Sequence, residues 1–80
     1  MQGLDVRGKR ADEALQIVTR FIDDAIISGE KNLKILHGKG NGILKNMIRE
    51  YLATQSIVRS CKDERLQLGG SGITLVELDY

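Results

Sequence analysis

The feature that most limits the possible folds is the spacing of apolar residues. Twice along the 80 residues it changes from every second position, as in a strand, to every three or four positions, as in a helix. Leu4 and Val6 in segment 3–8 alternate as in a strand, whereas residues 11–26 carry apolar side chains every three or four positions, as on an amphipathic helix. Gly29 then stands where a left-handed C-cap would end that helix. Residues 32–37 repeat the strand pattern and residues 44–54 the helix pattern.

The last third of the chain predicts two further strands, 57–62 and 73–78, joined by a turn region without a helix. The order is therefore β-α-β-α-β-β, and right-handed crossovers make the first three strands parallel, with both helices on one face. The last strand should run antiparallel. It is apolar on both faces, which favours an interior place, whereas Arg59 and Lys62 favour an edge for the third strand. We predict a two-layer α/β (α+β) sandwich with a four-stranded mixed sheet.

Composition narrows the function classes. The net charge is only +1, so any affinity for nucleic acid must come from a local patch, and 4% aromatic residues are too few for a platform that stacks bases. The single cysteine excludes an intramolecular disulfide and a cysteine zinc site. No apolar run nears the ~20 residues that cross a bilayer, and no signal-peptide pattern is present. We expect one cytoplasmic domain over residues 1–80, excised from a longer protein, without a membrane partner.

The topology predicts that three glycine loops meet at one edge of the sheet. Segments 5–10, 37–42 and 69–72 hold seven of the nine glycines and should lie at the carboxyl ends of the parallel strands, where open α/β sheets bind ligands. Glycines allow close approach of the backbone, and cations and a helix N-terminus favour an anion. We therefore expect Asp5 and His37 to share one cationic hollow that binds phosphate, lined by Arg7, Lys9, Arg10, Gly38, Lys39, Gly40, Asn41, Gly42, Lys45, Gly69 and Gly70.

Each element of this site also has a structural interpretation. The segment GKGNG does not match the Walker pattern, so it could be a plain strand-to-helix turn. His37 could be a structural histidine, and Asp5 could simply bond backbone nearby. Arg20, Lys31, Lys34 and Arg49 are expected on solvated faces. The convergence of Asp, Arg, His and Lys on one glycine-lined edge favours the functional interpretation.

Three motifs carry a resemblance to a known family. The segments LDVRG at 4–8, HGKGNGILK at 37–45 and GGSGITLVEL at 69–78 resemble the signature motifs of the Smr (small MutS-related) domain, most closely the Smr domain that ends the bacterial MutS-like paralogue. The resemblance implies a fold like the C-terminal domain of bacterial translation initiation factor three, with strand order 1-2-4-3. It also implies binding of DNA or RNA, and in several members nicking or cleavage.

Motif by motif, the resemblance assigns roles. The LDxR motif, implicated in cleavage, maps onto Asp5 and Arg7. The HGxG motif maps onto His37, Gly38 and Gly40, and Asn41 stands where many members have threonine. Relatives that act without nuclease activity, for instance when the parent protein splits stalled ribosomes, keep a binding-only function open.

Two hypotheses follow for this chain, and a third class stays open. In the first, the domain is an endonuclease of DNA repair or recombination with Asp5, Arg7 and His37 as catalytic residues. His37 would be the general acid or base, and Asp5 would orient His37, activate water or hold Mg²⁺ or Mn²⁺. Arg7 and Lys39 would stabilise the charge of the pentacovalent phosphate. In the second, it is a non-catalytic module that docks on DNA, RNA or the ribosome in ribosome quality control, next to the body of a MutS-like ATPase. A purely structural or protein-interaction domain is the third class.

Overall fold

The computed structural model describes residues 2–80 and contains a four-stranded sheet and two long helices. The elements are β1 (Gln2–Asp5), α1 (Ala11–Ser28), β2 (Asn32–Leu36), α2 (Ile43–Ala53), β3 (Val58–Asp63) and β4 (Ile73–Leu78). Two short 3-10 helices, η1 (Leu66–Leu68) and η2 (Gly70–Gly72), lie between β3 and β4.

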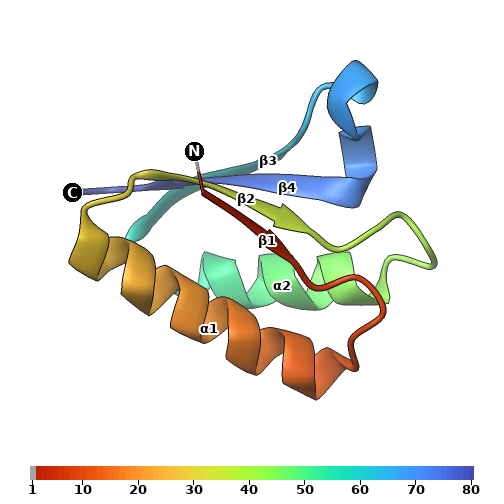
Figure 1. Cartoon of the computed structure of the whole chain (residues 1–80), viewed down its shortest axis with the longest axis horizontal. Coiled ribbons are helices and arrows are strands. Elements are labelled where there is room, and N and C mark those ends of the chain that lie inside the picture. The colour runs from red at the N-terminus through yellow and green to blue at the C-terminus, as the bar shows by residue number, and fades with distance from the viewer. Residues whose placement is uncertain (1) are drawn as a thin grey trace.

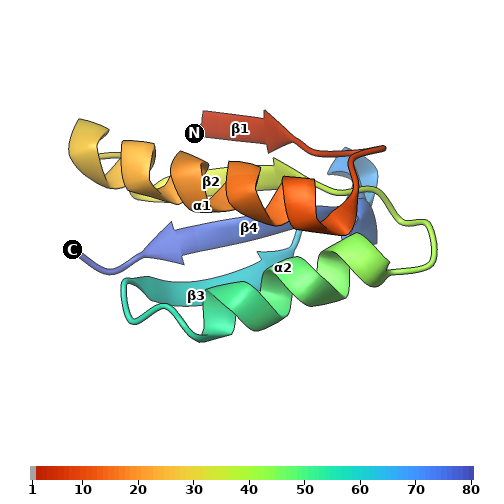
Figure 2. The same ribbon diagram turned by 90° about the horizontal axis from the view of Figure 1, so that it is seen from below.

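The strand order β1-β2-β4-β3 confirms the predicted topology. β1 pairs with β2 in parallel, and β4 runs antiparallel to both β2 and β3. Both helices cover the same face of the sheet, which leaves the other face open (Figure 1). Seen from the helix side, α1 and α2 lie side by side over the sheet and run roughly along its strands (Figure 2). The molecule is therefore the predicted two-layer α+β sandwich.

The apolar core lies between the sheet and the helices. Val18 and Ile22 of α1 and Ile48 and Leu52 of α2 are buried against strand residues such as Ile35. These are the positions that the helical period places on one face of each helix. Burial of these side chains holds the helices against one face of the sheet.

Helix α1 ends where the sequence predicts. Gly29 adopts φ 76°, in the left-handed region, and its N–H points to the carbonyl groups of Ala25 and Ile26.

β4 has the predicted bounds, whereas ends of β1, β2 and β3 differ from the prediction by one to three residues. β1 stops at Asp5 instead of residue 8, because the Asp5 carboxylate accepts a hydrogen bond from the Arg7 backbone N–H and turns the chain. Val6 still donates to the Leu36 carbonyl oxygen at 2.9 Å and is fully buried. The helices η1 and η2 were not predicted, because the exposed Leu66 and Leu68 give no periodic signal.

The three glycine loops lie at one end of the sheet, as predicted. β1, β2 and β3 end there and β4 begins there, so segments 6–10, 37–42 and 69–72 are neighbours (Figure 1). Within residues 2–80, neither α1 nor α2 has the length and apolarity that a membrane span requires.

Candidate functional site

The loops 37–42 and 69–72 are joined by backbone hydrogen bonds. The N–H groups of His37 and Gly38 both donate to the Gly72 carbonyl oxygen, at 3.1 and 3.0 Å. Gly72 lies so close that a Cβ there would come within 3.3 Å of Cγ of Lys39. Gly38, at φ 84°, faces the Arg7 side chain, so that a Cβ would lie 3.6 Å from Cγ of Arg7. Loop 37–42 therefore contacts both of the other motif segments.

The end of the sheet carries two hollows rather than one. The first, here called the helix-side hollow, has a volume of about 260 Å³ and lies between Lys9, Ala11 and segment 37–45. The second, the open-face hollow, has about 270 Å³ and is lined by Arg7, Leu36, Gly38, Lys39, Gly69, Gly72 and Ile73. Gly38 and Lys39 line both hollows and separate them.

This division separates Asp5 from His37, which we expected in one hollow. Asp5 pairs with Leu36, the last residue of β2, and His37 directly follows Leu36. Successive side chains of a strand point to opposite faces. His37 accordingly points to the helix side, where it contacts Thr74, whereas Asp5 binds Arg7, which lines the open-face hollow.

Asp5 and Arg7 form a two-point ion pair on the open side. Nε and Nη2 of Arg7 donate to Oδ1 and Oδ2 of Asp5 at 2.9 and 2.7 Å. Hydrogen bonds from the Arg7 side chain and backbone lower the pKa of Asp5 to about 2, so its carboxylate is charged at neutral pH. Both side chains are about half exposed, which leaves the remaining donors of Arg7 free to meet a ligand.

The fit of a metal ion to Asp5 is poor in this arrangement. Both carboxylate oxygens are engaged by Arg7. Within residues 2–80, no group of three or more His, Cys, Asp or Glu side chains could hold a metal ion. A divalent ion at Asp5 would have to take most of its ligands from water and substrate, and no step below is derived through one.

His37 is buried, with 5% of its surface exposed, and both ring nitrogens are engaged. Nδ1 lies 2.9 Å from the Gly38 carbonyl oxygen, and Nε2 lies 2.8 Å from Oγ1 of Thr74. Desolvation is the main cause that lowers the pKa of His37, and the charges of Lys45 and Arg49 lower it further. His37 is therefore neutral at pH 7.

Arg49 corrects the expectation of a solvated face. Its side chain is only 28% exposed, and it donates from Nε to Oγ1 of Thr74 at 2.9 Å and from Nη2 to Oδ1 of Asp63 at 2.8 Å. Neither Arg49 nor Thr74 was a candidate from the sequence. The available signal was Thr74 itself, a polar residue at a core-facing position of the otherwise apolar segment ITLVEL.

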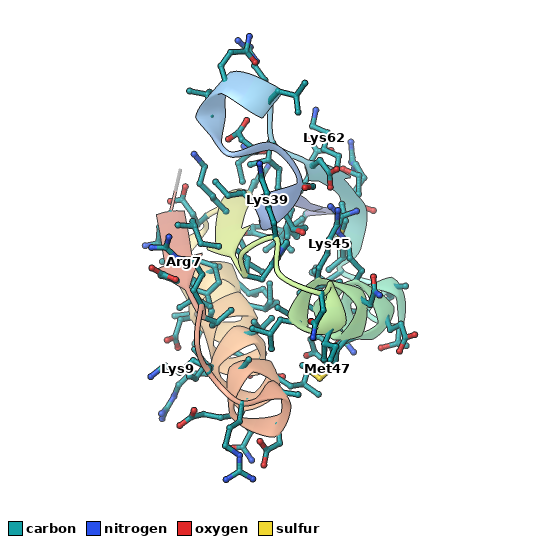
Figure 3. The ribbon with its side chains drawn as sticks, turned by 90° about the vertical axis from the view of Figure 1, so that its right-hand side faces the viewer. Arg7, Lys9, Lys39, Lys45, Met47 and Lys62 are labelled. Atoms are coloured by element: carbon teal, nitrogen blue, oxygen red, sulfur yellow. The ribbon has the colours of Figure 1, made fainter. Side chains whose placement is uncertain are left out.

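The expected cations differ in their availability. Lys45 pairs with Asp63 at 2.9 Å, and Arg10 lies 3.7 Å from Asp12. Lys9 and Lys39 form no ion pair with any residue in the described range 2–80. Figure 3 looks onto this end of the molecule, with Lys39 on the loop between Arg7 and Lys45.

The remaining candidates divide between the hollows. Gly40, Asn41 and Gly42 line the helix-side hollow, and Oδ1 of Asn41 accepts a hydrogen bond from the Ile43 N–H at the start of α2. Gly69 lines the open-face hollow. Gly70 is buried and lines neither hollow, so its place is structural in this arrangement.

Comparison with known proteins gives consistent matches. A family model described as the Smr domain matches residues 4–79. Over 75 residues the chain is 43% identical to the protein named Endonuclease MutS2 of Helicobacter pylori and 43% identical to that of Caldicellulosiruptor saccharolyticus. These alignments cover 94% of this chain and 10% of each relative, so the chain spans about a tenth of the length of the curated relatives.

Solved structures agree with this result. The crystal structure of the Smr domain of Thermus thermophilus MutS2 matches with a TM-score of 0.96 at 38% identity, over 100% of both chains. YdaL, a stand-alone small MutS-related protein from Escherichia coli, matches with a TM-score of 0.83 at 28% identity, over 98% of this chain and 64% of that one.

Proposed function

The chain belongs to the Smr domain family, and on that premise we propose that it binds the sugar–phosphate backbone of a nucleic acid and cleaves one strand of it. The observation that carries the proposal is the position of loop 37–42 between two hollows, with Arg7 on one side and Lys9 on the other. Lys39 lines both hollows and has no ion-pair partner within residues 2–80. A phosphate in either hollow would meet Lys39 and one further cation, Arg7 on the open side or Lys9 on the helix side.

Binding should depend on phosphate rather than on base sequence. No helix of the chain carries a set of Asn, Gln or Arg side chains placed to read base edges in a groove. The glycines of the loop let the backbone approach a phosphate, and the N-terminus of α2 lies directly after it. We therefore propose contacts to phosphate and sugar, with weak discrimination between sequences.

We propose that Asp5 and Arg7 carry the cleavage step. The free donors of Arg7 would bind oxygens of the scissile phosphate and stabilise the charge that develops on them, while Asp5 orients Arg7 and an attacking water. The water oxygen bonds to phosphorus and the bond from phosphorus to the leaving sugar oxygen breaks. The proton of the water goes to solvent, and the leaving oxygen is protonated from solvent.

A second candidate function is binding without cleavage. The observation that favours it is the low pKa of Asp5, about 2, which makes this carboxylate a weak general base. His37 is less suited to its expected role as general acid or base, because Gly38 and Thr74 occupy both of its ring nitrogens. That role remains an alternative to positioning.

Nicking of supercoiled plasmid tests the proposal. We expect the native chain to convert supercoiled to open-circular DNA, and Asp5→Ala or Arg7→Ala to lower the rate at least ~100-fold, as loss of a single charge-stabilising group does in other enzymes. Structured RNA is assayed in parallel, with and without Mg²⁺ or Mn²⁺, because the metal requirement and the choice of nucleic acid are separate questions.

The matched control is the ion pair Arg59–Asp79, in which Nη2 also lies 2.7 Å from a carboxylate oxygen. It lies at the other end of the sheet, because Asp79 follows the last residue of β4, which begins at the glycine loops. Asp79→Ala should leave nicking unchanged. Cleavage by Asp5→Ala at the native rate would remove the catalytic assignment, and binding without any cleavage by the native chain would favour the second candidate.

A further inference from the structure

A chain of hydrogen bonds runs from the surface of the sheet to loop 37–42. It starts at Asp63 on β3, which accepts from Arg49 on α2 at 2.8 Å. Arg49 donates to Thr74 on β4 at 2.9 Å, and Thr74 lies 2.8 Å from His37 at the end of β2. His37 then contacts the Gly38 carbonyl oxygen at 2.9 Å. Three secondary-structure elements thus converge on one imidazole.

Donor and acceptor chemistry fixes the proton positions along this chain. A carbonyl oxygen only accepts, so Nδ1 of His37 must carry a proton. A guanidinium only donates, so Oγ1 of Thr74 accepts from Arg49. The Thr74 hydroxyl then has its own proton to give, and Nε2 of a neutral His37 is the acceptor in reach.

A second proton on His37 would break this pattern. Nε2–H would become a donor, and the Thr74 hydroxyl, which is fully buried, would lose its acceptor. The charged groups facing the ring are Lys45 and Arg49 from α2 and Asp63 from β3, while Lys9 lines the same hollow. Burial and the two α2 cations lower the pKa of His37, which agrees with the neutral tautomer.

The tautomer matters because Nδ1–H donates a hydrogen bond to the Gly38 carbonyl oxygen and so fixes the orientation of the next peptide bond. The peptide bond between Gly38 and Lys39 is trans, so the Lys39 N–H points opposite to the Gly38 carbonyl group. With that carbonyl bound to His37, the Lys39 N–H is turned away from the imidazole. Over residues 2–80, the backbone N–H groups of residues 39–42 donate to no protein acceptor. They remain available to an anion.

We propose that Thr74 and Arg49 are positioning residues that fix the tautomer of His37. In that tautomer His37 holds the Gly38 carbonyl group and presents the Lys39 amide, next to the Lys39 side chain, to a bound phosphate. This inference deepens the proposed function and rests on it for the phosphate ligand. It makes His37 a positioning residue as well, acting through the backbone instead of through proton transfer.

The first test is the protonation state of the ring. His37 is the only histidine of the chain, so its imidazole signals can be assigned by ¹⁵N NMR without ambiguity. We expect a neutral ring with the proton on Nδ1 at pH 7. A ring protonated on Nε2 instead, or an imidazolium, would overturn the proposal.

The second test follows the Lys39 amide signal during titration with inorganic phosphate. Thr74→Val keeps the shape of the side chain but removes the hydroxyl. We expect a changed His37 tautomer and about tenfold weaker phosphate binding, because tenfold corresponds to the loss of about one hydrogen bond to a charged group. Thr74→Ser restores the hydroxyl and should bind within about twofold of the native chain. Native affinity in Thr74→Val would contradict the proposal.

Arg49→Lys serves as the second variant if Thr74→Val does not fold. It keeps the positive charge near His37 but lacks the rigid pair of donors that join Thr74 to Asp63. We expect weaker phosphate binding and a perturbed tautomer here too. An unchanged tautomer and an unchanged affinity in Arg49→Lys would overturn the role of Arg49.

The nicking assay separates positioning from proton transfer. In His37→Asn the side-chain N–H replaces Nδ1–H and can still bond the Gly38 carbonyl oxygen, whereas His37→Leu has no donor. We expect His37→Asn to retain most of the phosphate affinity and, where the native chain nicks, at least a tenth of the native nicking rate. We expect His37→Leu to lose both the affinity and the nicking. Equal loss of nicking in both variants would show proton transfer by His37.

If the native chain does not nick, the proposed cleavage fails, and the NMR tests still decide the positioning role.

Discussion

At the scale of single residues, the buried imidazole of His37 connects folding to pH. Its pKa is lowered in the folded chain, chiefly by burial, so between the folded and unfolded pKa values the unfolded chain binds more protons. Stability is therefore full above the unfolded value of about 6.5 and falls as the pH drops through it. We expect the free energy of unfolding in urea to decrease from about pH 7.5 to about pH 5.

His37→Asn is the control for this pH dependence, because it should remove most of the decrease in this window. Hydrogen bonds lower the pKa values of the carboxyl groups of Asp5, Asp63 and Glu64, so the stability that these groups contribute is lost at lower pH than that of His37. A slope as steep in His37→Asn as in the native chain would assign the effect to another group.

Single residues also show which candidates sequence reasoning can select and which it cannot. Asp5, Arg7 and His37 could be chosen because each belongs to a short motif at the end of a predicted strand. Arg49 could not be chosen, because its partners Thr74 and Asp63 lie 25 and 14 residues away in the chain and meet it only after α2 packs on the sheet. Side-chain networks between distant segments leave no local pattern.

At the scale of elements, loop 37–42 packs so closely against Gly72, the residue just before β4, that this position requires a small side chain. Gly72→Ala would place Cβ 3.3 Å from Cγ of Lys39 and 3.5 Å from the Gly38 backbone. We expect a loss of about 1–3 kcal/mol in the free energy of unfolding, measured in urea, as for other overpacked sites. Displacement of Lys39 should also weaken binding of nucleic acid.

Gly3→Ala is the matched control, a strand glycine whose added Cβ would have the Lys34 carbonyl oxygen at 3.9 Å as its nearest neighbour. It should be neutral or stabilise the chain by up to about 1 kcal/mol, because alanine restricts the unfolded state more than glycine does. Equal destabilisation by both substitutions would mean that the contact with loop 37–42 is not the cause.

At the scale of the whole molecule, connection rules placed the three loops at one end of the sheet before any coordinates were known. They could not predict the division into two hollows. That division depends on the register in which Asp5 faces Leu36, and a shift of one residue would exchange the faces of Asp5 and His37. The register is set by the packing of Leu33 and Ile35 in the core, which is a property of the assembled sandwich.

The arrangement of charge over the whole molecule predicts the salt dependence of binding. Lys45 and Arg10 have acidic partners, whereas Lys9 and Lys39 form no ion pair within residues 2–80. Arg7 is paired with Asp5 but keeps free donors, so we take Arg7, Lys9 and Lys39 as the three phosphate contacts. Three contacts to duplex DNA predict a slope of about −2.7 for log K against log salt, because each released counterion contributes about 0.9. Fluorescence anisotropy of a labelled duplex at several salt concentrations measures this slope.

Removal of one contact should change the slope by a fixed amount. Lys39→Gln should reduce its magnitude by about 0.9 and weaken binding to all sequences alike. Lys31→Gln is the control, because Lys31 directly precedes β2 and so lies at the end of the sheet opposite to the loops, with Nζ 5.9 Å from the centroid of the Tyr80 ring. It changes the net charge by the same amount. An equal change of slope in both variants would mean that net charge, and not the loop between the hollows, governs binding, and the phosphate site would then have to be sought elsewhere on the surface.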